Sequence, residues 1–375
     1  MSKKVILSVI SDLVTDQRVH RAATTLSQNG FDVMVVGRQL KNSLPMTIQP
    51  YQTKRFELWW EKGPLFYMHY NIKLFFFLIM NRADILLSND LDTLLPNFIV
   101  SRLRKTKLVY DSHEYFTEVP ELVSRPRTQK IWKGLESYIL PKIKNMYTVN
   151  ESIASFYKEM YHIPVKVIRN VPLLYESNIS SKHQLRFELN LPIDKMIFIL
   201  QGSGINIDRG AEEAVEAINK IDEAVLLIAG NGDVIPRLKK MVADLKLEDK
   251  IIFKNKMPAD ELRKYTAAAD VGLSLDKDTN LNYRFSLPNK LFDYIQAGLP
   301  VIASDLPEVK RIVLNYKVGI ITASSSANDV TTCMLQMMNN PDHISDYKLN
   351  TVAAAQVLNW QKEQLVLLNI FESLE

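Results

Sequence analysis

Short apolar runs alternate with amphipathic helical stretches along almost the whole chain. The run over residues 5–9 is followed by a helical stretch over residues 18–29, a glycine, and a second run over residues 31–36. Because parallel strands joined by crossover helices produce this alternation, the pattern predicts βαβ units around a parallel sheet. Further strands are predicted at residues 85–87, 107–110, 145–149 and 165–168, with a helix at residues 151–161.

A second series of the same kind begins after residues 170–172. Its strands are predicted at residues 196–200, 224–228, 250–253, 271–274, 301–303 and 319–321. Its helices are predicted at residues 211–221, 234–246, 259–269, 289–297 and 307–314. The tail over residues 345–374 has a helical apolar pattern and no strand, so it can cap the sheets or cross back to the first domain.

The chain of 375 residues is long enough for two domains. We expect an α/β protein of two Rossmann-like, doubly wound parallel sheets that face each other across a cleft. The predicted boundaries are 1–170 for the first domain, 171–350 for the second and 351–375 for a C-terminal helix that packs back on the first. Ligands of such sheets bind beyond the carboxyl ends of the strands, so the residues after each strand are the candidate site.

Composition excludes several classes of protein. With 47% hydrophobic and 23% charged residues the chain is globular rather than disordered or fibrous. Its single cysteine, Cys333, excludes an internal disulfide and a cysteine-rich zinc site, and is typical of a reducing compartment. The N-terminus leads directly into a strand rather than a signal peptide, so we expect a cytoplasmic protein.

The positive charge is concentrated in one segment. Residues 101–144 hold ten Lys or Arg against five acids, whereas the whole chain carries +4. Such a surface can bind anionic lipid headgroups, phosphorylated acceptors or nucleic acid, and a merely solvated face is an equally good interpretation. Because no nucleic-acid-binding motif accompanies it, we expect no nucleic-acid partner.

The most apolar stretch, residues 64–80, is interrupted by His69, Asn71 and Lys73 and is too short to span a bilayer. Together with Trp59 and Trp60 it could dock on an anionic membrane, at the inner face of the cell membrane. A core helix of the first domain is the favoured interpretation.

Residues 201–210 read Gln-Gly-Ser-Gly-Ile-Asn-Ile-Asp-Arg-Gly after the first strand of the second series. A dinucleotide fingerprint would need a further glycine where the second isoleucine stands. What remains is a turn, Gly202-Ser203-Gly204, leading to Arg209 at a helix start, where backbone N–H groups and a guanidinium can bind a phosphate. An ordinary turn with a solvated arginine is the alternative.

The next strand ends in Gly230-Asn231-Gly232, whose glycines permit close approach of a flat or charged ligand or simply form a tight turn. Farther along, a helix is predicted to begin at Ser286 or Leu287 with a proline in its first turn.

The first turn of this helix is the strongest candidate for an anion site. The free amides of Asn289 and Lys290, with the lysine charge, are expected to face an anion. Asp293 lies on nearly the same face and can reach ribose hydroxyls while the lysine meets phosphates. A Lys290–Asp293 pair within the helix is the alternative.

The chain resembles the GT-B fold glycosyltransferases of the retaining family 4 type over essentially its whole length. The match is strongest in residues 283–301, which are similar to a bacterial subgroup with Ser-Leu-Pro-Asn-Lys-Leu-Phe-Asp-Tyr followed by Gly-Leu-Pro-Val. Residues 11–30, including Asp16-Gln17-Arg18-Val19, resemble the first βα unit of the family. Residues 110–114, Tyr-Asp-Ser-His-Glu, resemble its strand-end histidine motif.

The resemblance implies a retaining glycosyltransferase that moves a sugar from a nucleoside-diphosphate sugar to a glycan, lipid-linked or other acceptor, in bacterial cell-surface polysaccharide synthesis. It implies that Arg209 and Lys290 hold the donor diphosphate without a metal, and that His113 of the other domain faces the donor sugar. Residues implied to bind the nucleotide sugar are Gly202, Ser203, Gly204, Gly230, Asn231, Gly232, Asn289 and Asp293.

Two departures from the family pattern leave alternatives open. Phe285 stands where the family often has the first glutamate of a Glu-x7-Glu pair, and Ser203 stands where it commonly has an arginine. Two alternatives to a glycosyltransferase therefore stay open. One is a non-catalytic nucleotide-sugar-binding partner, and the other is a nucleotide-sugar epimerase of the same fold. The Asp90-Leu91-Asp92 string resembles a metal-binding motif, but an ordinary loop after the strand over residues 85–87 is favoured, and no metal is expected.

Overall fold

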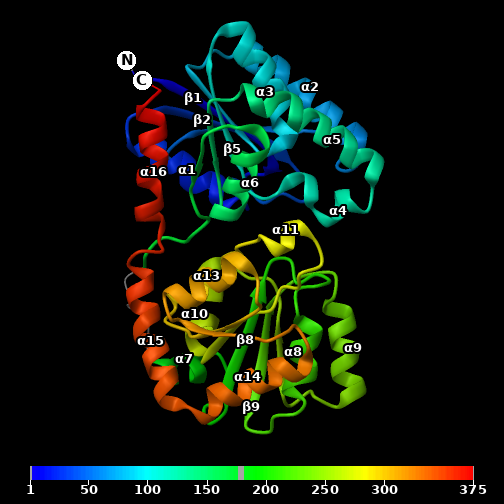
Figure 1. The fold of residues 1–375 in the computed structure, drawn as a ribbon, viewed down its shortest axis with the longest axis vertical. Helices are drawn as coiled ribbons and strands as arrows, with labels where there is room; N and C mark the ends of the chain where they lie inside the picture. The colour runs from blue at the N-terminus through cyan, green and yellow to red at the C-terminus, as the bar shows by residue number, and fades with distance from the viewer. Residues whose placement is uncertain (1, 176–180, 375) are drawn as a thin grey trace. The chain divides into compact units, whose positions relative to one another are not determined.

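The computed structural model describes residues 2–175 and 181–374, which form two compact units. The first unit comprises Met1–Asn170 and Gln361–Glu375, and the second comprises Val171–Trp360. Each unit is built on a parallel sheet flanked by helices (Figure 1). The predicted α/β class with two doubly wound parallel sheets is therefore confirmed.

The sheet of the first unit has seven strands in the order β3-β2-β1-β4-β5-β6-β7. The strands are β1 (Lys4–Asp12), β2 (Asp32–Gln39), β3 (Gln52–Glu57), β4 (Ile85–Asn89), β5 (Lys107–Ser112), β6 (Asn145–Thr148) and β7 (Val165–Val167). The strand order reverses between β1 and β4, which is where ligands of such sheets usually bind. The sequence does not predict β3, because this edge strand is mostly polar and exposed.

Helices cover both faces of this sheet (Figure 1). They are α1 (Gln17–Gln28), α2 (Pro64–Met80), α3 (Leu91–Arg104), α4 (Pro120–Val123), α5 (Pro126–Ile139), α6 (Glu151–Tyr161) and α16 (Trp360–Glu372), with short 3-10 turns η1 (Phe116–Glu118) and η2 (Leu140–Lys142). One face of α2 packs Tyr70, Leu74 and Leu78 against the sheet residues Ile6 and Leu86. The predicted core helix is therefore confirmed for that face. Within the described residues, no helix combines the length and apolarity needed to cross a membrane.

The C-terminal helix α16 belongs to the first unit. The ring of Phe371 lies 5.9 Å from that of Phe31 in an edge-on contact. Glu363 accepts hydrogen bonds from the backbone N–H and the guanidinium of Arg169, each at 2.8 Å. Residues 361–374 therefore belong to the first unit, whereas residues 351–360 remain with the second.

The sheet of the second unit has six strands in the order β10-β9-β8-β11-β12-β13. The strands are β8 (Met196–Gly202), β9 (Ala224–Gly230), β10 (Ile251–Lys254), β11 (Val271–Ser274), β12 (Val301–Ala303) and β13 (Gly319–Ile321). The helices are α7 (Lys182–Glu188), α8 (Ala211–Ile218), α9 (Ile235–Leu245), α10 (Ala259–Ala268), α11 (Leu281–Arg284), α12 (Asn289–Gln296), α13 (Pro307–Asn315), α14 (Ala327–Asn339) and α15 (Pro341–Ala355).

Alternate residues of β8 point into two different cores. Phe198 and Leu200 pack in the core that includes α8, α9 and α14, whereas Ile197 and Ile199 pack in the core that includes α10, α12, α13 and α15. A strand buried on both faces has no polar side, which is why these strands appear in the sequence as unbroken apolar runs. The sheet is thus a rigid support for the loops at its carboxyl edge.

Candidate active site

The two glycine-containing loops of the second unit are joined through their backbones. Gly202 ends β8 and pairs in register with Gly230, which ends β9. The N–H of Asn231 donates to the carbonyl of Gly202 at 3.3 Å, and the N–H of Ile205 donates to the carbonyl of Asn231 at 2.8 Å. The two segments that the sequence presents separately are therefore one surface at the carboxyl edge of the sheet.

Glycine is required at two positions of this surface. A Cβ at Gly230 would lie 1.8 Å from the carbonyl oxygen of Gly202, and the residue has a φ of +138°. A Cβ at Gly232 would lie 2.0 Å from the carbonyl oxygen of Ile205. The tight loop packing itself thus explains these two glycines, while the tips of the loops, Ser203 and Asn231, remain exposed.

A buried carboxylate joins the two predicted phosphate-binding cations. The guanidinium Nη1 of Arg209 lies 2.9 Å from Asp276 Oδ1, and the Nζ of Lys290 lies 3.1 Å from Asp276 Oδ2. Asp276 follows β11 and is only 1% exposed. Burial alone would raise its pKa, but the charges of Lys290 and Arg209 hold the pKa of this carboxyl below its ordinary value. The cluster of two cations and one anion therefore keeps a net positive charge.

Local backbone geometry brings Arg209 to this cluster. Asp208 and Gly210 both have positive φ, at 66° and 75°, so the chain turns sharply around the arginine. A Cβ at Gly210 would lie 2.3 Å from the carbonyl oxygen of Leu275, so the turn packs directly on the end of β11. The guanidinium also lies over the ring of Tyr283, 4.1 Å from its centroid.

Helix α12 begins where the predicted range 289–297 begins. Its first residue is Asn289, and Pro288 is the N-cap residue with extended φ and ψ rather than a member of the first turn. A helix start at Ser286 or Leu287 is therefore wrong: the N–H of Ser286 instead bonds to the carbonyl of Tyr283 as the short helix α11 ends. Asn289 and Lys290 still occupy the first turn, where backbone N–H groups lack helical partners.

Asp293 lies one turn into α12 beside a polar cluster of the sheet. Gln201, which is buried, donates from Nε2 to Asp293 Oδ2 at 3.3 Å and accepts from the hydroxyl of Thr266 at 2.6 Å. Lys290 makes its ion pair with Asp276, so the structure places the two predicted residues in separate contacts. The hydroxyl of Tyr294 holds the same strand end by accepting the N–H of Gln201.

In the first unit, His113 lies between two carboxylates. Its Nδ1 lies 3.2 Å from Asp90 Oδ2, and its Nε2 lies 3.1 Å from Asp111 Oδ2. Nε2 also lies 3.3 Å from the side-chain oxygen of Asn89. Both ring nitrogens thus contact protein groups, and a bound sugar would have to replace one of these contacts or use another atom of the residue.

The carboxylates make this histidine a cation. Burial by itself would lower its pKa, but Asp90 and Asp111 raise the pKa of His113 to about 9. For Asp111, burial is opposed by the charges of Arg18 and His113, which bring its pKa to about 2. Arg18 donates two hydrogen bonds to Asp111, at 2.9 and 2.7 Å. At neutral pH the site therefore contains an imidazolium, which cannot act as a general base.

The first acid of the Asp-x-Asp string contacts other groups of the protein. Asp90, with a φ of 58°, accepts the backbone N–H of His113 at 2.8 Å. Asp92 lies in the first turn of α3 and is 6% exposed. Within residues 2–175 and 181–374, no group of three or more histidine, cysteine or acidic side chains is arranged to hold a metal ion.

Several residues of these clusters are not singled out by the sequence. Asp276 stands just after a strand, so a strict search of strand ends would have found it. Gln201 and Asp111 directly follow the predicted strands 196–200 and 107–110, so the same search would have found them, although the strands of the structure extend past both residues. Arg18 belongs to the motif that resembles the family's first βα unit, but only the structure shows its contact with Asp111.

Both units match known families of sequences. Residues 16–171 match the family described as Glycosyltransferase Family 4, and residues 182–354 match that described as Glycosyl transferases group 1. The chain is 24% identical over 242 residues to a chitobiosyldiphosphodolichol beta-mannosyltransferase of Candida albicans, which covers 60% of this chain and 52% of the relative. The matched region thus spans about half the length of that relative.

The fold matches solved structures over nearly its full length. A sucrose-phosphate synthase of Thermosynechococcus elongatus has a TM-score of 0.80 at 18% identity, with 99% of each chain covered. The Anabaena protein HepE in complex with UDP-glucose has a TM-score of 0.76 at 14% identity, also with 99% of each chain covered. At these identities the similarity shows the fold alone.

Proposed function

We propose that this chain, which has a GT-B fold with a family 4 and a group 1 glycosyltransferase domain, transfers a sugar from a nucleoside-diphosphate sugar to a hydroxyl of an acceptor. The observation that carries the proposal is the Arg209–Asp276–Lys290 cluster at the carboxyl edge of the second sheet. The complex of HepE with UDP-glucose supports the same class of donor.

The cluster is suited to the charge that develops in glycosyl transfer. When the bond between the anomeric carbon and the phosphate oxygen breaks, negative charge grows on the departing diphosphate. Preorganised cations stabilise that charge, at about 3–4 kcal/mol for each well-placed donor. Arg209 and Lys290 carry two positive charges that one carboxylate only partly neutralises, so they can serve the leaving group without a metal ion.

The surrounding loops are suited to the rest of the nucleotide. Residues 202–204 and 230–232 carry only glycines and the exposed, small polar side chains of Ser203 and Asn231. The first-turn amides at Asn289 and Lys290 supply further donors to phosphate oxygens. Asp293, held by Gln201, is the proposed partner of the ribose hydroxyls.

The proposed transfer retains the configuration of the anomeric carbon. The acceptor hydroxyl attacks on the face that the diphosphate leaves, and its proton passes to a phosphate oxygen. This route needs no nucleophile and no general base from the protein, which agrees with the imidazolium state of His113. We propose that His113 positions the donor sugar, with its charge fixed by Asp90 and Asp111.

A glycan or lipid-linked acceptor is proposed, in the synthesis of bacterial cell-surface polysaccharide. The name of the Candida albicans relative, a chitobiosyldiphosphodolichol beta-mannosyltransferase, supports a lipid-linked acceptor. An anomeric analysis of the product by NMR tests the retaining outcome, and an inverted product would contradict it.

The donor is tested with the purified chain and a panel of UDP-, GDP- and ADP-sugars. A sugar nucleotide that binds the folded state must raise the melting temperature, and turnover must release the nucleoside diphosphate. EDTA should leave turnover unchanged. Binding without release would instead identify a non-catalytic binding protein, and a changed sugar without an acceptor would identify an epimerase.

Lys290→Ala tests the cluster directly. We expect turnover to fall about 100-fold or more while the melting temperature stays within a few degrees, because Asp276 keeps Arg209 as a partner. The matched control is Lys310→Ala, which removes an exposed lysine of α13 that pairs with Asp305. Equal turnover in the two variants would exclude Lys290 from the mechanism.

A further inference from the structure

Helix α2 is apolar on both of its faces. One face packs into the core of the first unit through Phe66, Tyr70, Leu74 and Leu78. The outward face repeats at the same helical spacing but has no protein covering it within the described residues. Its large apolar side chains are 48–75% exposed, and they are Leu65, Met68, Ile72, Phe76 and Met80.

Helix α3 continues this outward surface. It lies beside α2 in the first unit (Figure 1), and its exposed positions recur every four residues. These positions are again apolar: Leu95, Ile99 and Leu103, of which Leu103 is 65% exposed. We call the exposed side chains of residues 65, 68, 72, 76, 80, 95, 99 and 103 the α2–α3 face. An apolar surface of this extent on one unit of a protein marks an interaction site.

Two tryptophans lie next to the α2–α3 face. The ring of His69, which lies one turn from Leu65 and from Ile72, is 5.0 Å from the ring of Trp59 and 5.8 Å from that of Trp60. Trp59 is 81% exposed. Exposed tryptophan beside an apolar helix face is typical of the boundary between headgroups and acyl chains in a bilayer.

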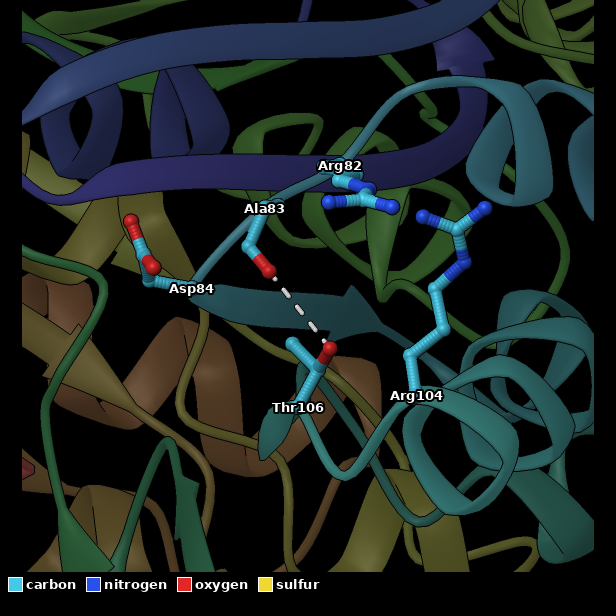
Figure 2. A pocket seen from close by; sticks show the side chains of 5 residues that line it. All are labelled: Arg82, Ala83, Asp84, Arg104 and Thr106. Carbon is cyan, nitrogen blue, oxygen red and sulfur yellow. Dashed lines mark hydrogen bonds between the residues drawn. The ribbon is translucent and has the colours of Figure 1, made fainter.

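Positive charge is concentrated where α2 and α3 end. A pocket of about 480 Å³ is lined there by Arg82, Ala83, Asp84, Arg104 and Thr106. Figure 2 shows the two guanidinium groups directed toward each other on one side of the pocket and the Asp84 carboxylate on the other. Asp84 accepts the backbone N–H of Lys4 at 2.7 Å, and Arg104 donates to the carbonyl of Ile79. In the part of the chain that the structure describes, neither Arg82 nor Arg104 forms an ion pair with a carboxylate.

Apart from Asp84, which lines the pocket, the helices beside these arginines carry little negative charge. Helix α2 contains no acidic residue, and Asp92, the acid of α3, is only 6% exposed. Arg102 and Lys105 add further positive charge at the end of α3. Apolar side chains that can enter acyl chains thus stand beside cations that can bind phosphate, which is the combination that an anionic bilayer complements.

We propose that the α2–α3 face docks this protein on a bilayer surface rich in anionic phospholipid, with Arg82 and Arg104 binding a lipid phosphate. The pocket precedes β4 and β5, so it lies at the opposite edge of the first sheet from His113, which follows β5. Docking therefore leaves the carboxyl edge of that sheet open. The proposal concerns a partner of the protein and does not depend on the transfer reaction.

Vesicle flotation of the full chain tests the proposal. Vesicles of phosphatidylcholine are compared with vesicles that also contain phosphatidylglycerol, at low and high salt. We expect the protein to float with the anionic vesicles at least tenfold more than with the neutral ones, and salt to weaken this binding. Absence from the anionic vesicles at low salt would overturn the proposal.

Two double variants separate the contributions of the pocket and the apolar face. Arg82→Gln with Arg104→Gln should lower binding to anionic vesicles about tenfold or more and remove the preference for phosphatidylglycerol. Ile72→Ser with Phe76→Ser should weaken binding to both kinds of vesicle. The matched control, Lys240→Gln with Lys264→Gln on exposed positions of α9 and α10, should float like the unaltered protein.

Circular dichroism and melting curves confirm that each variant is folded. Release of nucleoside diphosphate with a soluble acceptor should be unchanged in the arginine variant, so failure of docking and failure of the transfer activity are distinguishable. Unaltered flotation of both double variants would overturn the proposal. The proposal would also be overturned if the protein were a dimer that does not float with vesicles and that dissociates in the Ile72→Ser, Phe76→Ser variant. The α2–α3 face would then join two copies of the chain.

Discussion

The ammonium group of Lys290 lies 3.1 Å from the Oδ2 atom of Asp276, a carboxylate with almost no exposed surface. The same carboxylate contacts Arg209 at 2.9 Å, so one anion keeps two cations close together. A positively charged pair without this anion would separate by mutual repulsion. In the proposed reaction Asp276 therefore positions the two cations, since its own negative charge would repel the leaving diphosphate.

Asp276→Asn tests this positioning role. We expect kcat to fall about 10–100-fold, because both cations lose their fixed position. The Kd for the nucleoside diphosphate should change far less, because the substitution also removes an anion that competes with the ligand. Steady-state kinetics and calorimetric titration measure the two quantities. Asp305→Asn, which alters an exposed ion pair with Lys310, is the control and should leave both unchanged.

His113 makes stability depend on pH. Its pKa is raised to about 9 in the folded chain, so folding favours its protonated form. The stabilisation is complete below the ordinary histidine pKa of about 6.5 and is lost as pH rises through about 9. We expect the free energy of unfolding to fall by up to about 3 kcal/mol across this interval, as measured by denaturant titration at several pH values.

His113→Gln should remove this dependence between pH 6.5 and 9. His183→Gln is the control, since His183 is exposed on α7. If the His113 variant kept the full slope of the original protein, the two carboxylates would not be holding the ring as an imidazolium.

Gly230→Ala should destabilise the second unit. The new methyl group would collide with the carbonyl of Gly202, and the φ of +138° is unfavourable for any L side chain. We expect a loss of about 2 kcal/mol or more in thermal unfolding, together with weaker binding of the donor nucleotide. Gly204→Ala, whose Cβ would meet only Asn206 at 3.6 Å, should change stability little. Equal stability of the two variants would contradict the close loop packing.

Most of the fold can be predicted from the sequence because its strands are buried on both faces. Runs such as residues 196–200 and 224–228 are unambiguous, since an apolar run bounded by turns and followed by an amphipathic helix has few other interpretations. The edge strand β3 lacks this signal, because its exposed residues are polar on both sides. The start of α12 is ambiguous in the sequence, since Pro288 is equally compatible with an N-cap and with a first turn.

The candidate site is predictable only where its residues follow a strand or begin a helix. Arg209, Lys290 and His113 stand at such positions, and their proposed roles await the experiments above. Asp276, Gln201 and Asp111 contribute through contacts between segments far apart in the chain. No local pattern encodes such contacts, so only the structure shows that Lys290 pairs with Asp276 rather than with Asp293.

The placement of α16 has a consequence for synthesis on the ribosome. The first unit needs Leu367 and Phe371 in its core, although these residues are translated after the entire second unit. The second unit is continuous and can fold while the chain is still being made. The unit that is translated first is therefore the one that finishes folding last, since Phe31 lacks its ring contact with Phe371 until α16 has been made.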